Sequence, residues 1–329
     1  MMAMAKLCMA LFTVASVAGP AAAVAAEIEP DLKVAFLGDQ GLTPDSKAVL
    51  RLIKGENAHM VLHLGDFDYA DNPDAFDMQI NEILGPDFPY FAVIGNHDRK
   101  MWDIYQDLLE ARLKRVKGAE CEGEFGTRAA CTYKGLFFIL SAVGITEPGE
   151  TRPKDGDKSQ VHTAYIKDML ARAKSPWKIC AWHKNQTAMQ LGTKKNETGW
   201  GVYEACRKGG AIIATGHEHS YSRTHLIGAF GDPPVVASRD KTLRLEKGRT
   251  FAFVSGLGGR SVRGMSEHRE SKKIDPWWAA FYTRDQDATA GALFCTFSPG
   301  GQKQRANCYF KAINGEVPDR FKVISTLGD

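Results

Sequence analysis

The chain has 329 residues and a formal net charge of +3, with 25% of its residues charged. Acidic and basic residues alternate locally, and the lack of a basic block argues against a nucleic-acid partner. This length allows one large α/β domain with a sizeable core. Beyond the N-terminal segment, no stretch is apolar for long enough to cross a bilayer, so we expect no membrane span.

Residues 1–26 have the features of a signal peptide. Lys6 provides a small positive region, and residues 7–18 form an apolar stretch that is too short for a stable membrane anchor. Ala23-Val24-Ala25 is a small-x-small cleavage site. We therefore expect an exported protein, periplasmic or secreted, whose mature domain covers residues 27–329. The alternative is a retained N-terminal anchor.

Cysteine content agrees with export. Once Cys8 is removed with the leader, six cysteines remain, and an even number in an exported protein suggests disulfides. The expected pairs are Cys121–Cys131, Cys180–Cys206 and Cys295–Cys308. The first and third pairs flank glycine-containing loops, and the second is left by elimination. Free buried thiols are the alternative.

Strands and helices are predicted to alternate in the first third of the mature chain. The predicted strands cover residues 32–37, 59–64 and 89–94, and the predicted helices cover residues 44–54, 73–84 and 102–117. Thr43 is the expected N-cap of the first helix, with Pro44 in its first turn. This alternation predicts parallel strands joined by helical crossovers.

The remainder is richer in strands. Further strands are predicted over residues 124–133, 136–142, 177–182, 211–215, 250–255, 292–297, 306–313 and 320–325, and helices over residues 159–173 and 201–207. Residues 144–158 and 184–199 are predicted to be polar loops. The expected fold class is α/β, with a two-sheet β-sandwich flanked by helices in α-β-β-α layers.

Five short blocks carry groups that bind metals. They are Gly38-Asp39-Gln40-Gly41, Gly65-Asp66-Phe67-Asp68-Tyr69, Gly95-Asn96-His97-Asp98, His183 and Gly216-His217-Glu218-His219. Each follows the carboxyl end of a predicted strand, where open α/β sheets bind their ligands. A carboxylate can bridge two metals, and the glycines allow tight turns between the ligands. The pattern predicts a hydrolytic site with two metal ions.

These blocks, in this order, resemble the calcineurin-like metallophosphoesterases, and within them the purple acid phosphatases. The resemblance covers residues 32–260. Tyr69 is the discriminating residue, because the wider superfamily places a histidine ligand where this chain has Gln40. Purple acid phosphatases also lack that histidine and use a tyrosinate instead.

The resemblance implies a set of ligands for each metal. The implied ferric site consists of Asp39, Tyr69, His219 and the bridging Asp66, and the implied divalent site of Asp66, Asn96, His183 and His217. Iron, zinc and manganese are the candidates for the divalent ion. The implied reaction is hydrolysis of a small-molecule phosphate monoester, in which a metal-bound hydroxide attacks phosphorus.

Residues beside the ligands have less definite roles. His97 matches a family position that contacts substrate, so it is expected to orient the phosphate or to protonate the leaving oxygen. Its alternative role is a hydrogen bond to Asp98 or to the backbone, and Asp98 is expected to partner a histidine. Lys184 either meets an anionic substrate or lies solvated in a loop. Arg223 either bonds near the site or forms a structural salt bridge.

Two rival functions are considered. The first is a phosphodiesterase acting on cyclic nucleotides or phospholipid headgroups, because the same metal core performs both reactions and pocket shape separates them. Loops 144–158 and 184–199 are therefore expected to set specificity. The second is a non-catalytic exported binding protein on the same fold, although such a protein would be expected to have lost ligands. The sequence leaves the oligomeric state open.

Overall fold

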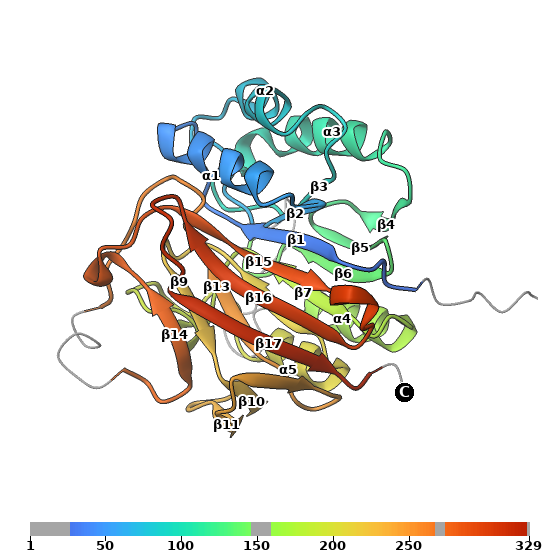
Figure 1. The fold of residues 1–329 in the computed structure, drawn as a ribbon, viewed down its shortest axis with the longest axis vertical. Helices are drawn as coiled ribbons and strands as arrows, with labels where there is room; N and C mark the ends of the chain where they lie inside the picture. Colours follow the sequence, from blue (N-terminus) through green and yellow to red (C-terminus); the bar gives the residue numbers. More distant parts are fainter. Residues whose placement is uncertain (1–26, 146–158, 267–273, 328–329) are drawn as a thin grey trace, which may run out of the picture.

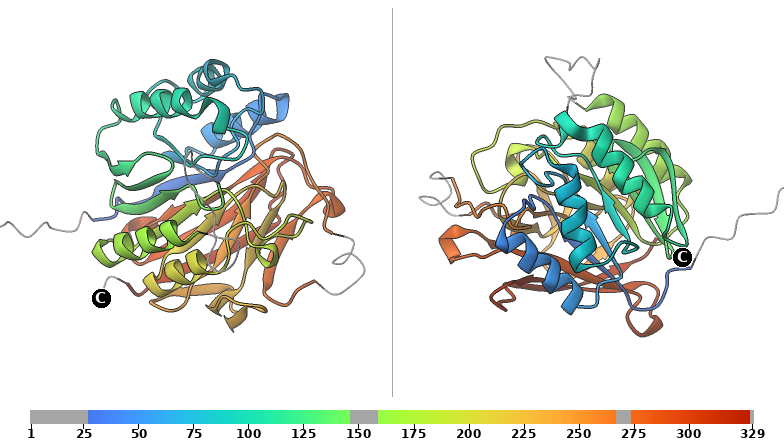
Figure 2. Two further views of the ribbon diagram at one scale, coloured as in Figure 1. Left: turned by 180° about the vertical axis from the view of Figure 1, so that it is seen from behind. Right: turned by 90° about the horizontal axis from the view of Figure 1, so that it is seen from above.

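We analysed a computed structural model of the protein, which describes residues 27–145, 159–266 and 274–327. Two large β-sheets pack face to face, with helices on their outer sides (Figures 1 and 2). The fold class expected from the sequence is therefore confirmed. The expected leader and most of loop 144–158 lie outside the described residues. Within the described part, no helix is both long and apolar enough to cross a membrane.

The first sheet has seven strands and contains the N-terminal half of the site. Its order is β12 (Thr242–Leu245), β17 (Asp319–Ser325), β16 (Arg305–Ala312), β15 (Gly291–Phe297), β1 (Leu32–Leu37), β2 (Met60–His63) and β3 (Tyr90–Ala92). β1, β2 and β3 run parallel, whereas β1 and β15 are antiparallel. Helices α1 (Pro44–Gly55), α2 (Pro73–Ile83) and α3 (Trp102–Leu113) cover the β1–β3 part of this sheet (Figure 1).

The second sheet has eight strands. Its order is β14 (Trp278–Tyr282), β9 (Tyr221–Thr224), β13 (Ala252–Ser255), β8 (Ile212–Thr215), β7 (Lys178–Trp182), β6 (Leu136–Ser141), β5 (Arg128–Tyr133) and β4 (Ala119–Glu124). Helices α4 (Gln160–Arg172) and α5 (Gly201–Gly209) lie along its outer face, as Figure 2 shows from behind. β10 (Leu226–Ala229) and β11 (Val235–Ser238) form a separate small ribbon.

Aromatic rings fill the space between the sheets. Phe36 of β1 meets Phe253 of β13 edge to face, with ring centroids 5.2 Å apart. Tyr221 of β9 and Phe310 of β16 lie 4.4 Å apart at the other side of the sandwich. Each fully buried ring of this kind stabilises the folded state by roughly 1.5–3 kcal/mol. The near-continuous apolar sequence of β1, which is buried except at Lys33, suits a strand that is covered on both faces.

The start of the first helix was predicted correctly. The Thr43 side chain accepts a hydrogen bond from the Ser46 backbone N–H, Ser46 reciprocates, and Pro44 occupies the first turn of α1. This capping box satisfies two N–H groups that the helix itself cannot bond. The predicted helix over residues 44–54 therefore begins where the cap places it.

The strand-rich part was predicted less completely. The helix predicted to reach residue 117 ends at Leu113, and β4 follows it as an edge strand that the sequence analysis missed. β4 is mostly exposed and polar, so it lacks the apolar alternation that marks a strand; pairing with β5 holds it in place. β9, β10, β11, β12 and β14 were also missed, and each has five residues or fewer.

All three expected disulfides are present. Cys121–Cys131 and Cys295–Cys308 each join residues directly opposite one another on antiparallel strands. Cys180–Cys206 ties β7 to α5. The Cys180–Cys206 pair therefore fixes a helix onto the sheet, a role that the spacing of the cysteines did not indicate.

A buried ion pair links the two sheets. Arg223 of β9 donates through Nε and Nη2 to the carboxylate of Asp319 on β17, at 2.7 and 3.0 Å. Tyr221 donates its hydroxyl to the same carboxylate at 2.7 Å, and the Phe321 ring lies 4.2 Å from the guanidinium. Of the two roles considered for Arg223, the structural salt bridge is the one present. Trp278 lies on β14, the strand next to β9, and its side chain is buried.

Removal of the Asp319 carboxylate should destabilise the protein strongly. Asp319→Ala leaves the Arg223 guanidinium buried without its partner, so we expect the free energy of unfolding to fall by about 3–5 kcal/mol. Urea denaturation measures this change. As a matched control, Asp87→Ala removes the exposed partner of Arg115 and should cost less than about 1 kcal/mol. Equal losses in the two variants would contradict a special role for the buried pair.

Candidate metal centre

The predicted ligand blocks meet at one end of the sandwich and come from both sheets. Asp39, Asp66 and Asn96 follow β1, β2 and β3 of the first sheet. His183 and His217 follow β7 and β8 of the second sheet. Because the carboxyl ends of these parallel strands lie at the same edge, side chains from residue 39 to residue 219 converge.

Several ligand residues have backbone conformations that side chains rarely adopt. The φ angles of Asp39, Asp66, Tyr69 and His217 are 58°, 59°, 59° and 70°. A residue with a side chain is held in this left-handed region at a cost on the order of 1–3 kcal/mol, and such residues cluster at functional sites. The fold therefore stores strain in the residues that would hold the metals.

The glycines before the predicted ligands allow both tight turns and close contacts between the blocks. Gly65 has a left-handed φ of 85°, whereas the φ of Gly95 is not positive. Gly95 is required for close approach instead, because a Cβ there would lie 2.1 Å from the backbone nitrogen of Asp66. Glycine at residue 95 lets the third block touch the second, which brings Asn96 to the site.

The first cluster consists of Asp39, Tyr69 and His219. The Tyr69 hydroxyl lies 2.8 Å from Asp39 Oδ1 and 3.2 Å from His219 Nε2, and these two atoms are 3.2 Å apart. Burial, together with the charges of Asp39 and Asp66, raises the pKa of Tyr69 well above its usual value. The phenol therefore stays protonated unless a strong cation offsets these effects.

The second cluster consists of Asp66, His183 and His217, whose ligand atoms all lie within 4.8 Å of one another. His183 Nε2 is 3.2 Å from Asp66 Oδ2 and 3.1 Å from His217 Nδ1. The Leu64 carbonyl accepts from His183 Nδ1 at 2.7 Å, which turns Nε2 toward the site. Burial lowers the pKa of His183, but Asp66 outweighs this effect and raises it to about 9.

Asn96 and His97 complete the site. Asn96 Oδ1 is buried and has no hydrogen-bond partner in the described part of the chain. The His97 backbone N–H donates to Asp66 Oδ1 at 2.9 Å, and its exposed ring lies 4.6 Å from the Tyr69 ring. His97 thus lies at the entrance of the site, and among the described residues the Asp98 carboxylate accepts from backbone N–H groups rather than from the His97 ring.

The donor groups fit two cations. Ligands that bind a metal at about 2.0–2.2 Å lie roughly 3 Å from one another, as the paired atoms of both clusters do. The buried amide oxygen of Asn96, which has no partner among the described residues, is available as a further ligand. Gln40 does not, because its amide donates to Gln79 and accepts from the Tyr90 hydroxyl, at 2.8 and 2.7 Å.

One supporting residue differs from expectation. Asp98 was expected to partner a histidine, but its carboxylate accepts backbone N–H groups of Asp66, Phe67 and Gly95 at 2.9, 2.7 and 2.6 Å. Two of these N–H groups belong to the turn after β2 and the third to the loop after β3, so a single buried carboxyl group joins the two segments. Asp98 therefore holds the loop that carries Asp66 rather than orienting an imidazole.

The sequence analysis missed a residue behind His217. Glu197 Oε2 lies 3.0 Å from His217 Nε2, and the other oxygen of Glu197 pairs with Lys184. Burial opposes ionisation, but His217 and Lys184 together lower the pKa of Glu197 to about 2. A charged Glu197 accepts from Nε2–H and leaves Nδ1 of His217 free to bind a metal.

Neither role considered for Lys184 is correct. Its ammonium is largely buried against Glu197, so it is neither a solvated loop lysine nor free to meet a substrate.

Lys194, from the same loop, instead reaches the site, with Nζ 3.1 Å from His217 Nδ1. Ser261 backs the other cluster, with Oγ 2.6 Å from His219 Nδ1. None of these pairs has a spacing in the sequence that could have revealed it.

The two-sheet fold thus carries a candidate metal centre whose donor groups come from both sheets. The family model of the calcineurin-like phosphoesterases matches residues 32–221. The chain therefore belongs to the calcineurin-like phosphoesterase family. A search of curated proteins found no match.

Solved structures with the same fold include phosphatases. Purple acid phosphatase PPD1 from yellow lupin (Lupinus luteus) seeds has a TM-score of 0.59 and 18% identity, and the match covers 91% of this chain and 55% of that one. This chain therefore spans little more than half of the lupin enzyme. A dimetal phosphatase from Danio rerio has a TM-score of 0.51 and 12% identity, with coverage of 91% and 100%.

The same fold also occurs in a protein described as an anchor. GAP50 from Plasmodium, the anchor in the inner membrane complex, has a TM-score of 0.58 and 14% identity, and the match covers 90% of this chain and 89% of that one. At these identities the likeness concerns the fold alone. Function must therefore be argued from the site.

Loss of the Glu197 carboxylate should weaken metal binding. Glu197→Ala frees the His217 ring to turn, so we expect affinity for a divalent ion to fall about 10–100-fold. Competition with a chelator of known affinity measures this change. Glu246→Ala, which breaks an exposed pair with Arg249, is the matched control and should leave affinity unchanged. Unaltered binding in Glu197→Ala would show that Glu197 does not position His217.

Proposed function

We propose that the protein hydrolyses phosphate monoesters at a centre of two metal ions. The observation that supports this most directly is the convergence of Asp39, Tyr69 and His219 on one side and of Asp66, His183 and His217 on the other. Asp66 lies between the clusters, with one oxygen toward His183 and the other bonded to the His97 amide. This position suits a bridging carboxylate.

In this proposal each cluster holds one ion. Asp39, Tyr69, His219 and Asp66 would hold Fe(III), and Asp66, Asn96, His183 and His217 would hold divalent iron, zinc or manganese. Burial and the neighbouring carboxylates raise the pKa of Tyr69, and a strongly charged ion at the first position would offset these effects and favour the phenolate. When bound, the two ions would neutralise the phosphate oxygens and supply a nucleophilic water.

The chain's own groups would bind and orient the substrate. His97 is exposed beside Tyr69, so its imidazole can hydrogen-bond a phosphate oxygen or protonate the leaving alcohol. Lys194 adds a positive charge at the second cluster, where a phosphate would arrive. Asp98 and Glu197 would keep their partners in place as the phosphate charge enters.

Two rivals follow from the same fold. A phosphodiesterase would use the same donors and differ in the loops, one of which, residues 184–199, contributes Lys194 and Glu197 to the site. A non-catalytic binding protein would have no need of a complete donor set. The retention of every predicted ligand residue favours an enzyme.

Three disulfides suit an oxidising compartment, and we propose that the protein is exported to the periplasm or beyond.

Substrate class is tested by comparing rates on p-nitrophenyl phosphate and bis(p-nitrophenyl) phosphate. We expect faster turnover of the monoester, and a loss of at least about 1,000-fold in Asp66→Ala, because both ions lose a ligand. Faster turnover of the diester would favour the phosphodiesterase. Hydrolysis of neither by a fully metallated protein would favour the binding protein.

The metal assignment is tested separately through Tyr69. Protein purified from an oxidising compartment should contain iron and show a broad visible absorption band. Tyr69→Phe should abolish the band and weaken iron binding, because the phenolate oxygen is lost. Tyr133→Phe, another buried tyrosine that lies outside the site, should keep both. A coloured Tyr69→Phe protein, or a colourless wild type with two equivalents of zinc, would refute the ferric-tyrosinate assignment.

A further inference from the structure

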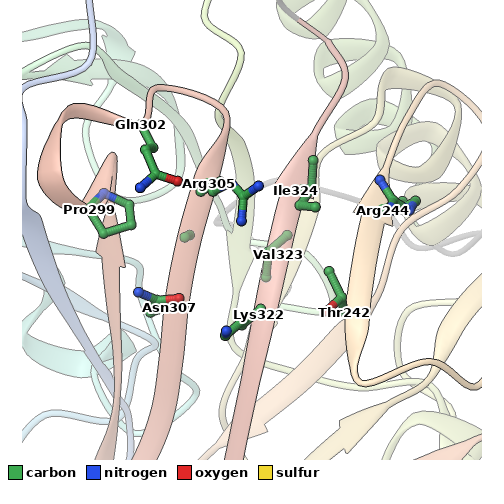
Figure 3. Close-up of a pocket in the computed structure, with 10 residues that line it drawn as sticks. Thr242, Arg244, Pro299, Gln302, Arg305, Asn307, Lys322, Val323 and Ile324 are labelled. Carbon is green, nitrogen blue, oxygen red and sulfur yellow. The ribbon is translucent and has the colours of Figure 1, made fainter.

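The outer face of the first sheet is open where it is made of β16, β17 and β12 (Figure 1). Residues along these strands alternate between buried and partly or fully exposed, as expected for a sheet with one solvated side. Two adjoining hollows of about 450 and 510 Å³ lie on this face and share Thr242, Asn307 and Lys322. Figure 3 shows the first of them, with Arg305 and Arg244 on either side of Val323 and Ile324.

Strand register spreads positive charge over this surface. Arg305 and Arg244 both lie opposite Ile324, one on each side of β17. Lys322 lies two residues back along β17, and Arg320 two further, opposite Tyr309. With strands about 4.8 Å apart and two-residue steps of about 6.8 Å, these cations extend well beyond the reach of a single phosphate. We call the two hollows together the basic face.

The basic face contains no compensating acid. Five cations line the two hollows, namely Lys241, Arg244, Arg305, Arg320 and Lys322, and no aspartate or glutamate lines either. None of the five has an ion pair to another described residue. Elsewhere on the surface, lysines and arginines pair with acids, as in Lys47–Glu82, Lys100–Asp71, Arg115–Asp87, Lys134–Glu29 and Lys303–Glu27. Like charges on neighbouring strands repel, so this face would be stabilised by an external anion.

We propose that the basic face binds a linear acidic polysaccharide. The hollows continue one another along the strands, which suits an extended chain with repeated negative charges. Between the cations stand Asn307, Thr242 and Gln302, whose amide and hydroxyl groups can bond sugar hydroxyls. Arginine forks recognise carboxylate or sulfate groups in two-point contacts. The site lies away from the metal ligands and does not depend on the proposed hydrolysis.

The side chains disfavour two other polyanions. A single-stranded nucleic acid needs open aromatic faces for its bases, but Tyr309 already has the Arg320 guanidinium 5.4 Å from its ring and Phe294 stacked beside it. Phe321 is 4% exposed and offers no free face. A bilayer would favour apolar side chains to insert, whereas the apolar residues of the first hollow are either buried, as Val323 and Ala306 are, or only partly exposed, as Pro299 and Ile324 are.

The test is fluorescence anisotropy with a labelled heparin decasaccharide across a salt series, on the full-length protein with its metals. The variant Arg244→Gln/Arg305→Gln/Lys322→Gln should bind about 100-fold more weakly than wild type. The control Arg51→Gln/Lys54→Gln/Lys117→Gln removes equal charge from exposed residues on and near the helices that cover β1–β3. It should retain the wild-type affinity, and both variants should keep the wild-type melting temperature and phosphoesterase rate.

Three results would overturn the proposal: no binding by wild type, an equal loss in both triple variants, or stronger binding to single-stranded DNA or to phosphatidylserine vesicles than to the oligosaccharide. An equal loss of affinity in both variants would mean that the oligosaccharide responds to the net charge of the protein and not to the basic face. Because the readout is binding to a sulfated sugar that the metal site does not hydrolyse, absence of phosphatase activity would leave this test intact.

Discussion

Everything in this structure depends on the way the two sheets are held together. Each proposed metal position takes ligands from both sheets: Asp39 and Tyr69 face His219 in one cluster, and Asp66 faces His183 in the other. A slide of one sheet over the other would separate every such pair. The aromatic layer between the sheets and the Arg223–Asp319 bond are therefore requirements of the site as well as of the fold.

Backbone strain and close backbone contacts are concentrated at the strand ends that carry the predicted ligands. Four ligand residues have left-handed φ angles, and Gly95 allows the third block to touch Asp66. Asp98 stabilises this arrangement by accepting three backbone N–H groups from the turns around it. The rest of the fold offsets the strain of these turns and so holds the donor atoms in place before any ion binds. Such preorganisation favours metal binding.

The fold class, the candidate site residues and the disulfides could be predicted from the sequence. Several short strands and the residues that support the site could not, for physical reasons. The α/β class and the ligand residues follow from short blocks in which glycine, acid and histidine occur at strand ends, and the disulfides from cysteine count and spacing. β4 and β9 escaped prediction because their stability comes from pairing, not from an apolar pattern in their own residues. Glu197, Lys194 and Ser261 escaped because each meets its histidine across a tertiary contact of 20 or more residues.

The spread of the ligands along the chain also has a consequence for how the protein matures. Asp39 and His219, which meet in one cluster, are 180 residues apart, and the second cluster spans residue 66 to residue 217. Neither position has its donors until β8 has docked beside β7 and the sheets have closed. In the proposed metal centre, a complete set of donors therefore exists only after both sheets have formed and packed together.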